Sequence, residues 1–312
     1  MIFEDEADES YPPRRRRFGR RNLSTKTTTT TTTTMTKTIG SVSGVGNESV
    51  GAMRRKVGFV GLGNMGLPMA VGLARNGMRG QGAYDADLDE GEGGAGGEPI
   101  TLVAYDPNPD SVSSIVESMK GGDNDDADDA GEYVDVVVVD SARDVGLAGC
   151  DVIFTSLPSD EIVRSVYDDL LEGATATTTT RASGNTAAST GETVGTVFVD
   201  CSTVSPSLSR DLHRDVLRAG GDGGDGNDDD NGFNGNGGFG MLDAPVSGGV
   251  VGAVSQTLTF MIGTSSSRSL YIALPYLKIM GKRILSCGGP GSGSVTKLCN
   301  NLALGIQMAG VC

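Results

Sequence analysis

A glycine-rich loop follows a short apolar segment near residue 56. Residues 56–60 have the β-branched composition of a strand, and glycines in a G-x-G-x-x-G spacing follow at once. Between a strand and a helix, the first glycine of this spacing permits a tight turn, the second lets the backbone approach a pyrophosphate, and the third lets the helix pack on the strand. The N-terminus of the helix then faces the anion. The loop predicted to bind a dinucleotide consists of Gly61, Leu62, Gly63, Asn64, Met65 and Gly66.

An acidic residue ends the next predicted strand, at residues 100–105. Asp106 can accept hydrogen bonds from the adenosine ribose hydroxyls and would repel a 2′-phosphate. This position favours NAD over NADP. The distance from Gly66 exceeds the usual spacing because an acidic insert intervenes, and an Asp-Pro turn that opens a helix stays an alternative interpretation.

Lys297 and Asn301 lie four residues apart in a segment that is predicted to be helical. At this spacing an amine and an amide emerge on the same face of a helix, where both can contact one small substrate. A solvated lysine on a helix surface is the alternative for an isolated residue. The nearby Asn301 and the glycine-rich segment before Lys297 favour a substrate-binding site.

Histidine and cysteine are too sparse for a metal site. The only histidine, His213, lies in a charged stretch and is predicted to be an ordinary surface residue. The five cysteines are far apart and include no C-x-x-C pair, which excludes a zinc site and a disulfide framework and indicates a reducing compartment.

Strand-like and helix-like segments alternate from residue 54 onward. This alternation predicts an α/β fold with a Rossmann-like, doubly wound parallel sheet. Low-complexity inserts are expected only in connecting loops, because the cost of closing a loop rises slowly with its length. The predicted strands are 56–60, 100–105, 134–139, 151–156, 196–199, 239–243 and 258–262, the helices are 64–76, 110–119, 160–171 and 206–219, and the inserts are 77–99, 121–132, 173–195 and 220–238.

Four motifs, in this order, resemble one family. They are GLGNMGLPMA at 61–70, DCSTVSP at 200–206, DAPVSGGVVGA at 243–253 and GGPGSGSVTKLCNN at 288–301. Together they are similar to the motifs of the β-hydroxyacid dehydrogenases, and the last one, with its K-x-x-N-N pattern, is most similar to the 3-hydroxyisobutyrate dehydrogenase type.

The resemblance implies a role for each motif. Lys297 is expected to be the general acid/base, because oxidation of an alcohol by hydride loss requires removal of the hydroxyl proton, and a nearby cationic nicotinamide would lower the pKa of the lysine. Glycine-containing turns can present backbone N–H groups to a carboxylate. The residues expected to bind substrate are Ser247, Gly248, Gly249 and Asn301, and those expected to line the nicotinamide are Leu157, Pro158 and Thr203. For Leu157 and Pro158, a simple end of a strand is an equal alternative.

The resemblance also implies a reaction. A hydride would pass to NAD from 3-hydroxyisobutyrate or a similar small β-hydroxyacid, giving methylmalonate semialdehyde in valine catabolism. Relatives that act on tartronate semialdehyde, succinic semialdehyde or glyoxylate stay alternatives, as does a catalytically inactive dinucleotide-binding module. The 6-phosphogluconate dehydrogenases share the architecture but typically carry a histidine at the position of Asn300.

Two departures from the family are evident. Gln256 replaces a usual glycine, so we expect a different turn near the substrate loop. The family continues after the last motif with an all-helical domain that supplies most of the dimer contact, so the full-length form is expected to be a homo-oligomer. We therefore expect a dinucleotide-binding domain over residues 54–290 and, in 291–312, only the first helix of an all-α C-terminal domain. The second half of this helix, residues 302–312, is apolar on all sides, and such a helix belongs in a buried position. Because nothing in the chain is expected to bury it, we expect an exposed apolar surface on this helix and negligible turnover by the truncated chain.

Charge and hydropathy limit the partners. The formal net charge of −15 argues against nucleic acid, whose phosphates need a basic surface. No apolar run reaches the ~18 residues of a membrane span. Residues 1–53 are predicted to be disordered or a targeting segment. Their arginine and threonine content suits import into mitochondria, whereas the acidic residues 4–9 do not, so the cytoplasm stays an alternative.

Overall fold

The computed structural model describes residues 55–76, 100–120, 135–183, 195–221 and 238–311. The predicted targeting segment lies outside these ranges, as do the inserts at 77–99 and 121–132 and large parts of the other two. The elements, in order, are β1 (Arg55–Val60), α1 (Gly66–Asn76), β2 (Ile100–Tyr105), α2 (Pro109–Lys120), β3 (Asp135–Val138), α3 (Ala142–Leu147), β4 (Val152–Thr155), α4 (Asp160–Ser183), β5 (Val197–Asp200), α5 (Pro206–Ala219), β6 (Gly240–Asp243), β7 (Val246–Ser247), α6 (Gly249–Val254), β8 (Leu258–Gly263), α7 (Ser267–Met280), β9 (Gly281–Gly288) and α8 (Ser292–Val311).

The sheet has the predicted doubly wound topology. Its parallel part has the strand order β3-β2-β1-β4-β5-β6. The chain adds β2 and β3 on one side of β1 and then β4 to β6 on the other, so the order reverses between β1 and β4. In such sheets ligands bind in the crevice at this reversal, beyond the carboxyl ends of the strands. Beyond β6 the sheet is mixed, because β8 pairs antiparallel with β6 and β7 but parallel with β9.

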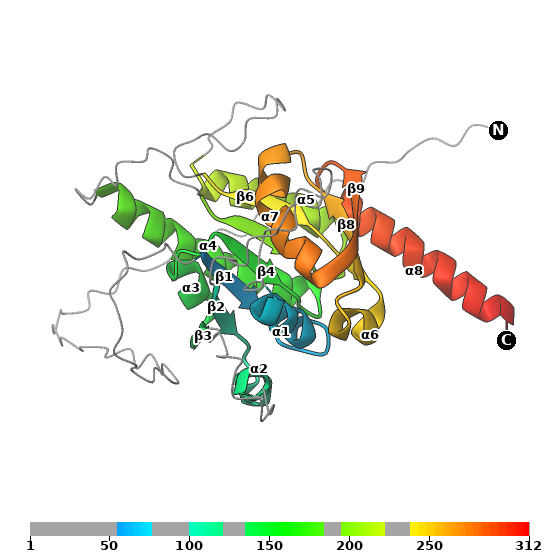
Figure 1. Cartoon of the computed structure of the whole chain (residues 1–312). Helices are drawn as coiled ribbons and strands as arrows, with labels where there is room; N and C mark the ends of the chain where they lie inside the picture. The colour runs from blue at the N-terminus through cyan, green and yellow to red at the C-terminus, as the bar shows by residue number, and fades with distance from the viewer. Residues whose placement is uncertain (1–54, 77–99, 121–134, 184–194, 222–237, 312) are drawn as a thin grey trace, which may run out of the picture. The chain divides into compact units, whose positions relative to one another are not determined.

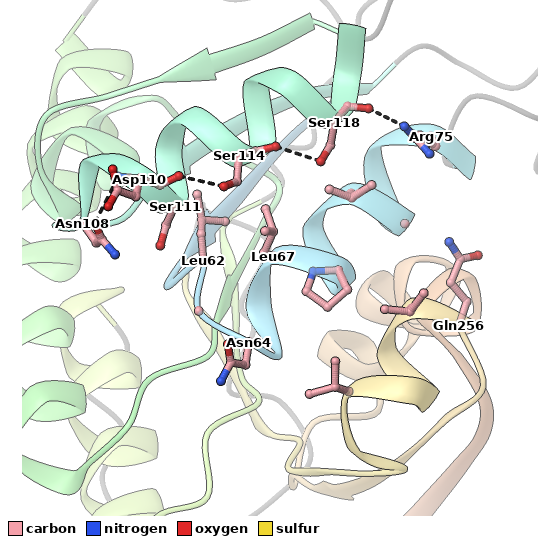
Figure 2. Close-up of a pocket in the computed structure, with 16 residues that line it drawn as sticks. Leu62, Asn64, Leu67, Arg75, Asn108, Asp110, Ser111, Ser114, Ser118 and Gln256 are labelled. Carbon is pink, nitrogen blue, oxygen red and sulfur yellow. Dashed lines mark hydrogen bonds between the residues drawn. The ribbon is translucent and has the colours of Figure 1, made fainter. Parts of the chain in front are cut away.

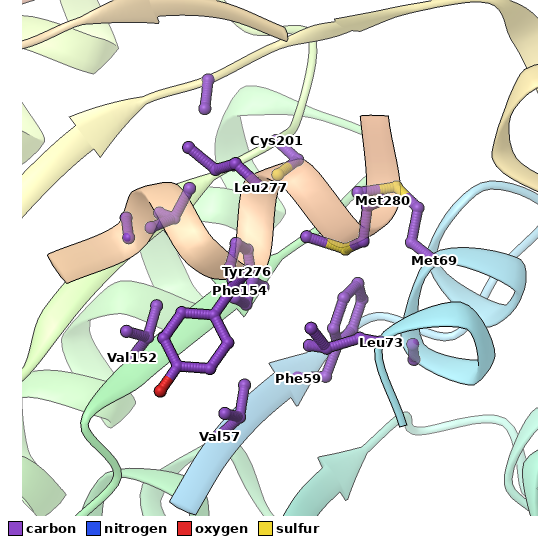
Figure 3. Packing of buried hydrophobic residues seen from close by; sticks show 14 of the residues in the cluster. Val57, Phe59, Met69, Leu73, Val152, Phe154, Cys201, Tyr276, Leu277 and Met280 are labelled. Carbon is purple, nitrogen blue, oxygen red and sulfur yellow. The ribbon is translucent and has the colours of Figure 1, made fainter. Parts of the chain in front are cut away.

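Two hydrophobic clusters cover the two faces of the sheet. Alternate residues of β1 point to opposite faces, and accordingly Val57 and Phe59 belong to the first cluster and Val60 to the second. Residues of α1 and α7 complete the first cluster, in which Phe59 lies over Phe154 with 6.0 Å between ring centroids (Figure 3). Residues of α3, α4 and α5 complete the second. Both faces are thus covered, as a parallel sheet requires.

The structure corrects the predicted end of α4. The sequence predicts that this helix ends at residue 171 and that an insert begins at 173, but α4 continues to Ser183. Gly173 packs against α3, because a Cβ there would collide with the carbonyl oxygen of Arg143. The hydroxyl of Thr178 donates to the carbonyl oxygen of Ala174 at 3.1 Å. This bond keeps a polar side chain within the helix.

Helix α8 begins against the sheet and extends away from it (Figure 1). Gly293 and Ser294, in its first turn, are buried. Farther along, Leu302 is 67 % exposed, and Ile306 and Met308 are each 64 % exposed. The exposed apolar surface expected from the sequence is therefore present on this helix.

Candidate functional site

The glycine loop has the geometry that its spacing predicts. Gly61 has a φ of +92°, which favours glycine, and its N–H donates to the carbonyl oxygen of Tyr105 at 3.0 Å. A Cβ on Gly66 would collide with the carbonyl oxygen of Gly61, so α1 can start this close to β1 only with glycine there. Gly63 is exposed, and a Cβ on it would meet no atom within 4 Å. The fold therefore requires glycine at positions 61 and 66, whereas no contact within the fold requires glycine at position 63.

Asp106 joins the end of β2 to the glycine loop. Its Oδ2 accepts from the N–H of Leu62 at 2.6 Å, and its Oδ1 accepts from the N–H of Asn108 at 2.8 Å. Each carboxylate oxygen has a second lone pair that these bonds leave available. The side chain is thus fixed beside the loop and can still accept from a ligand hydroxyl.

The ends of β4 and β5 are also tied together. The N–H of Leu157 donates to the hydroxyl of Ser202 at 2.9 Å. Leu157 is partly buried, while Pro158 and Thr203 are exposed. These three predicted nicotinamide contacts therefore lie at the carboxyl ends of neighbouring parallel strands, on the same edge of the sheet as Gly61 and Asp106.

A buried carboxylate lies beneath this edge. Asp200 is 1 % exposed, and its Oδ1 accepts from the hydroxyl of Thr155 at 2.9 Å and from the N–H of Ser202 at 3.1 Å. Its Oδ2 has no hydrogen-bond partner among the described residues. Burial raises the pKa of this carboxyl above its usual value, because desolvation outweighs the hydrogen bonds that favour the charged form.

The predicted substrate loop connects β7 to α6. Gly248 and Gly249 have φ angles of +134° and +61°, so both adopt conformations that side chains disfavour, and both are exposed. Gln256, which stands where the family usually has glycine, also has a positive φ of 58°. Its side chain is fixed on α1, because its Oε1 accepts from Nδ2 of Asn76 at 2.7 Å. Gln256, the departure from the family noted in the sequence, thus forms a turn whose backbone conformation is typical of glycine.

Lys297 and Asn301 lie one turn apart on α8, as their spacing predicts. Lys297 is partly buried and Asn301 is exposed. Burial lowers the pKa of the Lys297 ammonium from its usual value. No hydrogen bond joins either residue to residues 247–249 in the described part of the chain, so their joint contact with a substrate stays a prediction.

A cavity of about 600 Å³ begins at the glycine loop (Figure 2). Gly63 and Asn64 line one end, and the cavity extends between α1 and α2 to Arg75. Its remaining side is formed by α6 residues and Gln256. Neither Asp106 nor Lys297 lines this cavity, so it adjoins the predicted site at the glycine loop without including either residue.

No group of three or more residues suited to hold a metal ion occurs among the residues that the structure describes. Cys150, Cys201, Cys287 and Cys299 are free thiols there. In the same ranges, no helix is long and apolar enough to cross a membrane.

Sequence and structure comparisons show similarity to one family. A profile of the NAD binding domain of 6-phosphogluconate dehydrogenase matches residues 234–289. The mitochondrial 3-hydroxyisobutyrate dehydrogenase of Rattus norvegicus is 31 % identical over 274 residues, which is 88 % of this chain and 60 % of the relative. The solved structure of Mycobacterium tuberculosis 3-hydroxyisobutyrate dehydrogenase with L-serine is 28 % identical and matches with a TM-score of 0.53, over 83 % of this chain and 63 % of that one. Over more than four fifths of its length, the chain is similar to members of the β-hydroxyacid dehydrogenase family.

The proteins that are similar to this chain do not all carry the same name. An NAD-dependent L-serine dehydrogenase of Pseudomonas aeruginosa is 28 % identical over 258 residues, covering 82 % of this chain and 61 % of the relative. The chain spans about three fifths of the length of the curated relatives it matches.

The prediction that His213 is a surface residue is wrong. His213 is only 4 % exposed and lies within hydrogen-bond distance of Asp243, although its charged neighbours suggest a surface residue. The helical period gives the correct answer, because the buried residues of α5 are spaced as one stripe that includes position 213. They are Leu208, Ser209, Leu212, His213 and Val216.

Proposed function

We propose that the chain binds NAD across the carboxyl ends of β1, β2, β4 and β5. The glycine loop carries this proposal, since Gly63 is exposed and has open space where a side chain would otherwise stand. The pyrophosphate would lie over this backbone and face the start of α1. Leu62, Asn64 and Met65 would contribute the adjoining backbone of the loop.

Asp106 would receive the adenosine ribose. Its carboxylate is held in place by two backbone N–H groups and keeps lone pairs for the 2′- and 3′-hydroxyls. A 2′-phosphate would meet the same negative charge, so NAD is the proposed cofactor and NADP the weaker ligand.

Bound NAD would supply the hydride acceptor for the oxidation of a small β-hydroxyacid. Lys297 would take the hydroxyl proton as the C–H bond breaks, and its lowered pKa increases the fraction of neutral amine near neutral pH. Ser247, Gly248 and Gly249 would bind the carboxylate, Asn301 would orient the hydroxyl or carboxylate, and Leu157, Pro158 and Thr203 would line the nicotinamide.

The proposed substrate is 3-hydroxyisobutyrate, with methylmalonate semialdehyde as product and a place in valine catabolism. Relatives with this name support it. L-Serine is the second candidate, because one relative is named a serine dehydrogenase and one solved relative was studied with L-serine. Mitochondrial relatives likewise support a mitochondrial location. A homo-oligomeric full-length form is part of the same proposal and rests on the motif resemblance alone.

The test has two parts. Calorimetric titration of the 312-residue chain should show one saturable site for NAD. Reduced nicotinamide is then followed with 3-hydroxyisobutyrate, L-serine and glyoxylate-type substrates, in this chain and in a fusion that places the helical domain of a family member after Cys312. Hydroxyacid-dependent reduction that disappears in Lys297→Ala supports the proposal. Binding of NAD without turnover of any hydroxyacid in either form contradicts it.

A further inference from the structure

Four buried polar side chains join α5 and β6 to the first turn of α8. Ser209 and His213 come from α5, Asp243 ends β6, and Ser294 lies in α8. Their exposed fractions are 0, 4, 1 and 2 %, so bulk water does not compete for their hydrogen bonds. We call these four residues the α8 anchor.

Asp243 is the centre of the α8 anchor. Its Oδ1 accepts from the N–H of Gly291 at 2.8 Å, and its Oδ2 accepts from the N–H of Ser294 at 3.0 Å. These N–H groups belong to the start of a helix, where no carbonyl of the helix itself can accept from them. A carboxylate from a neighbouring strand thus caps α8 and also complements the positive end of its dipole.

The backbone around Asp243 is shaped to admit its carboxylate. A Cβ on Gly263 of β8 would collide with the Asp243 side chain, and a Cβ on Gly293 would lie 2.8 Å from its Oδ2. Both glycines therefore allow the strand and the helix to close on the carboxylate. The arrangement leaves little freedom for the start of α8.

Two bonds from α5 complete the α8 anchor. Nε2 of His213 lies 3.2 Å from Oδ1 of Asp243, and because the carboxylate oxygen is an acceptor, the imidazole N–H must donate. The hydroxyls of Ser209 and Ser294 are 2.8 Å apart. His213 and Ser209 are one turn apart on α5, so a single helix face holds both Asp243 and α8.

We propose that His213 and Asp243 are positioning residues that fix the orientation of α8 and thereby place Lys297 at the strand ends. The inference rests on the proposed function of Lys297. Lys297 follows Ser294 by three residues, which is about 4.5 Å along the helix axis. Beyond it the helix is exposed, so the described contacts that set its direction lie in its first half, against β6, β8, β9 and α5.

Amide hydrogen exchange tests the anchor without any need for turnover. In His213→Leu, the N–H groups of Gly291 and Ser294 should exchange at least ~10-fold faster than in the wild type, the scale of one lost hydrogen bond to a charged group. His213→Gln, whose amide Nε2 can donate from a similar position, should restore most of the protection. Tyr167→Phe is the matched control, because it removes a buried hydroxyl that contacts Thr155 but is not part of the anchor.

Turnover then separates positioning from general destabilisation. In whichever form oxidises a hydroxyacid, His213→Leu should lower kcat by about 10-fold or more while KM for NAD changes by less than about twofold, because a displaced proton acceptor affects the chemical step. Tyr167→Phe should leave both constants unchanged. If His213→Leu does not fold, Ser209→Ala should give the same pattern with a smaller amplitude.

The outcomes are distinct. Faster exchange at Gly291 and Ser294, a lower kcat and rescue by glutamine support the inference. Unchanged exchange, or a loss of kcat that glutamine does not restore and Tyr167→Phe reproduces, overturns it. If the wild-type chain and its fusion oxidise no hydroxyacid, the proposed function fails, and the exchange data alone then decide whether the anchor holds α8.

Discussion

Replacement of Asp106 by serine should narrow the preference for NAD over NADP. The Asp106 carboxylate accepts from Leu62 and Asn108 at the end of β2, and it is only partly buried. Its charge therefore acts through a water-like medium. Serine keeps a hydroxyl at this position but removes the charge that a 2′-phosphate would meet.

Coulomb's law gives the size of the effect. A single negative charge and a doubly charged phosphate at about 5 Å in water repel by about 1.7 kcal/mol. This energy corresponds to a factor of about 20 in the ratio of the two dissociation constants. Affinity for both cofactors should also fall, because the N–H of Leu62 loses its carboxylate acceptor and the glycine loop is less firmly held.

Calorimetric titration of NAD and NADP into the 312-residue chain measures the ratio. Asp110→Ser is the matched control, since it removes an exposed carboxylate at the start of α2 that makes no hydrogen bond to the loop in the described structure. The control should leave the ratio unchanged. A ratio in Asp106→Ser equal to that of the wild type would refute the role assigned to this carboxylate.

Three further predictions concern catalysis, pH and strain. Lys297→Ala should lower kcat by ~10² or more with NAD affinity nearly intact. In the wild type, kcat/KM for oxidation should rise with pH through a lysine pKa that lies below its usual value. Loss of NAD binding in Lys297→Ala would instead show that the lysine has a structural role. Asp200 has a raised pKa in the folded state, so its contribution to stability is present below its usual pKa and is lost as pH rises through the folded value. Asp200→Asn should remove this loss of stability in urea titrations at different pH values. An unchanged pH dependence of the unfolding free energy in Asp200→Asn would contradict this account. Because Gln256 has a positive φ, the free energy of unfolding of Gln256→Gly should be about 1 kcal/mol higher than that of Gln256→Ala. Both variants lose the hydrogen bond to Asn76, but only alanine keeps the backbone strain. Equal free energies of unfolding would argue against strain at this position.

Local patterns were sufficient for much of the fold. Strand 100–105 and helix 206–219 have the predicted bounds, because a short apolar, β-branched run and an apolar stripe of period 3.6 are visible in the sequence. The glycine loop was predicted for the same reason, since a tight turn and close packing need glycine at fixed positions.

Long-range contacts explain what was missed. The helical period places His213 on the buried face of α5, but its partner Asp243 lies thirty residues away in the sequence, so this contact could not be predicted from the local pattern. The continuation of α4 past Gly173 depends on its packing against α3. Gly173 lies where the two helices pack closely, and it does not start a loop. The roles of Lys297, Asn301 and residues 247–249 stay predictions, as do the domain boundaries at 54 and 290.

The most direct test of NAD binding at the glycine loop is the Gly63→Ala variant. A methyl group at this exposed position meets no atom of the protein within 4 Å, so the folded chain should be as stable as the wild type or slightly more stable. The same methyl group would stand where the pyrophosphate must approach the backbone. Calorimetry should therefore show an NAD affinity at least ~10-fold weaker, about 1.4 kcal/mol, with an unchanged unfolding temperature. Unchanged NAD affinity in a folded Gly63→Ala protein would contradict the account.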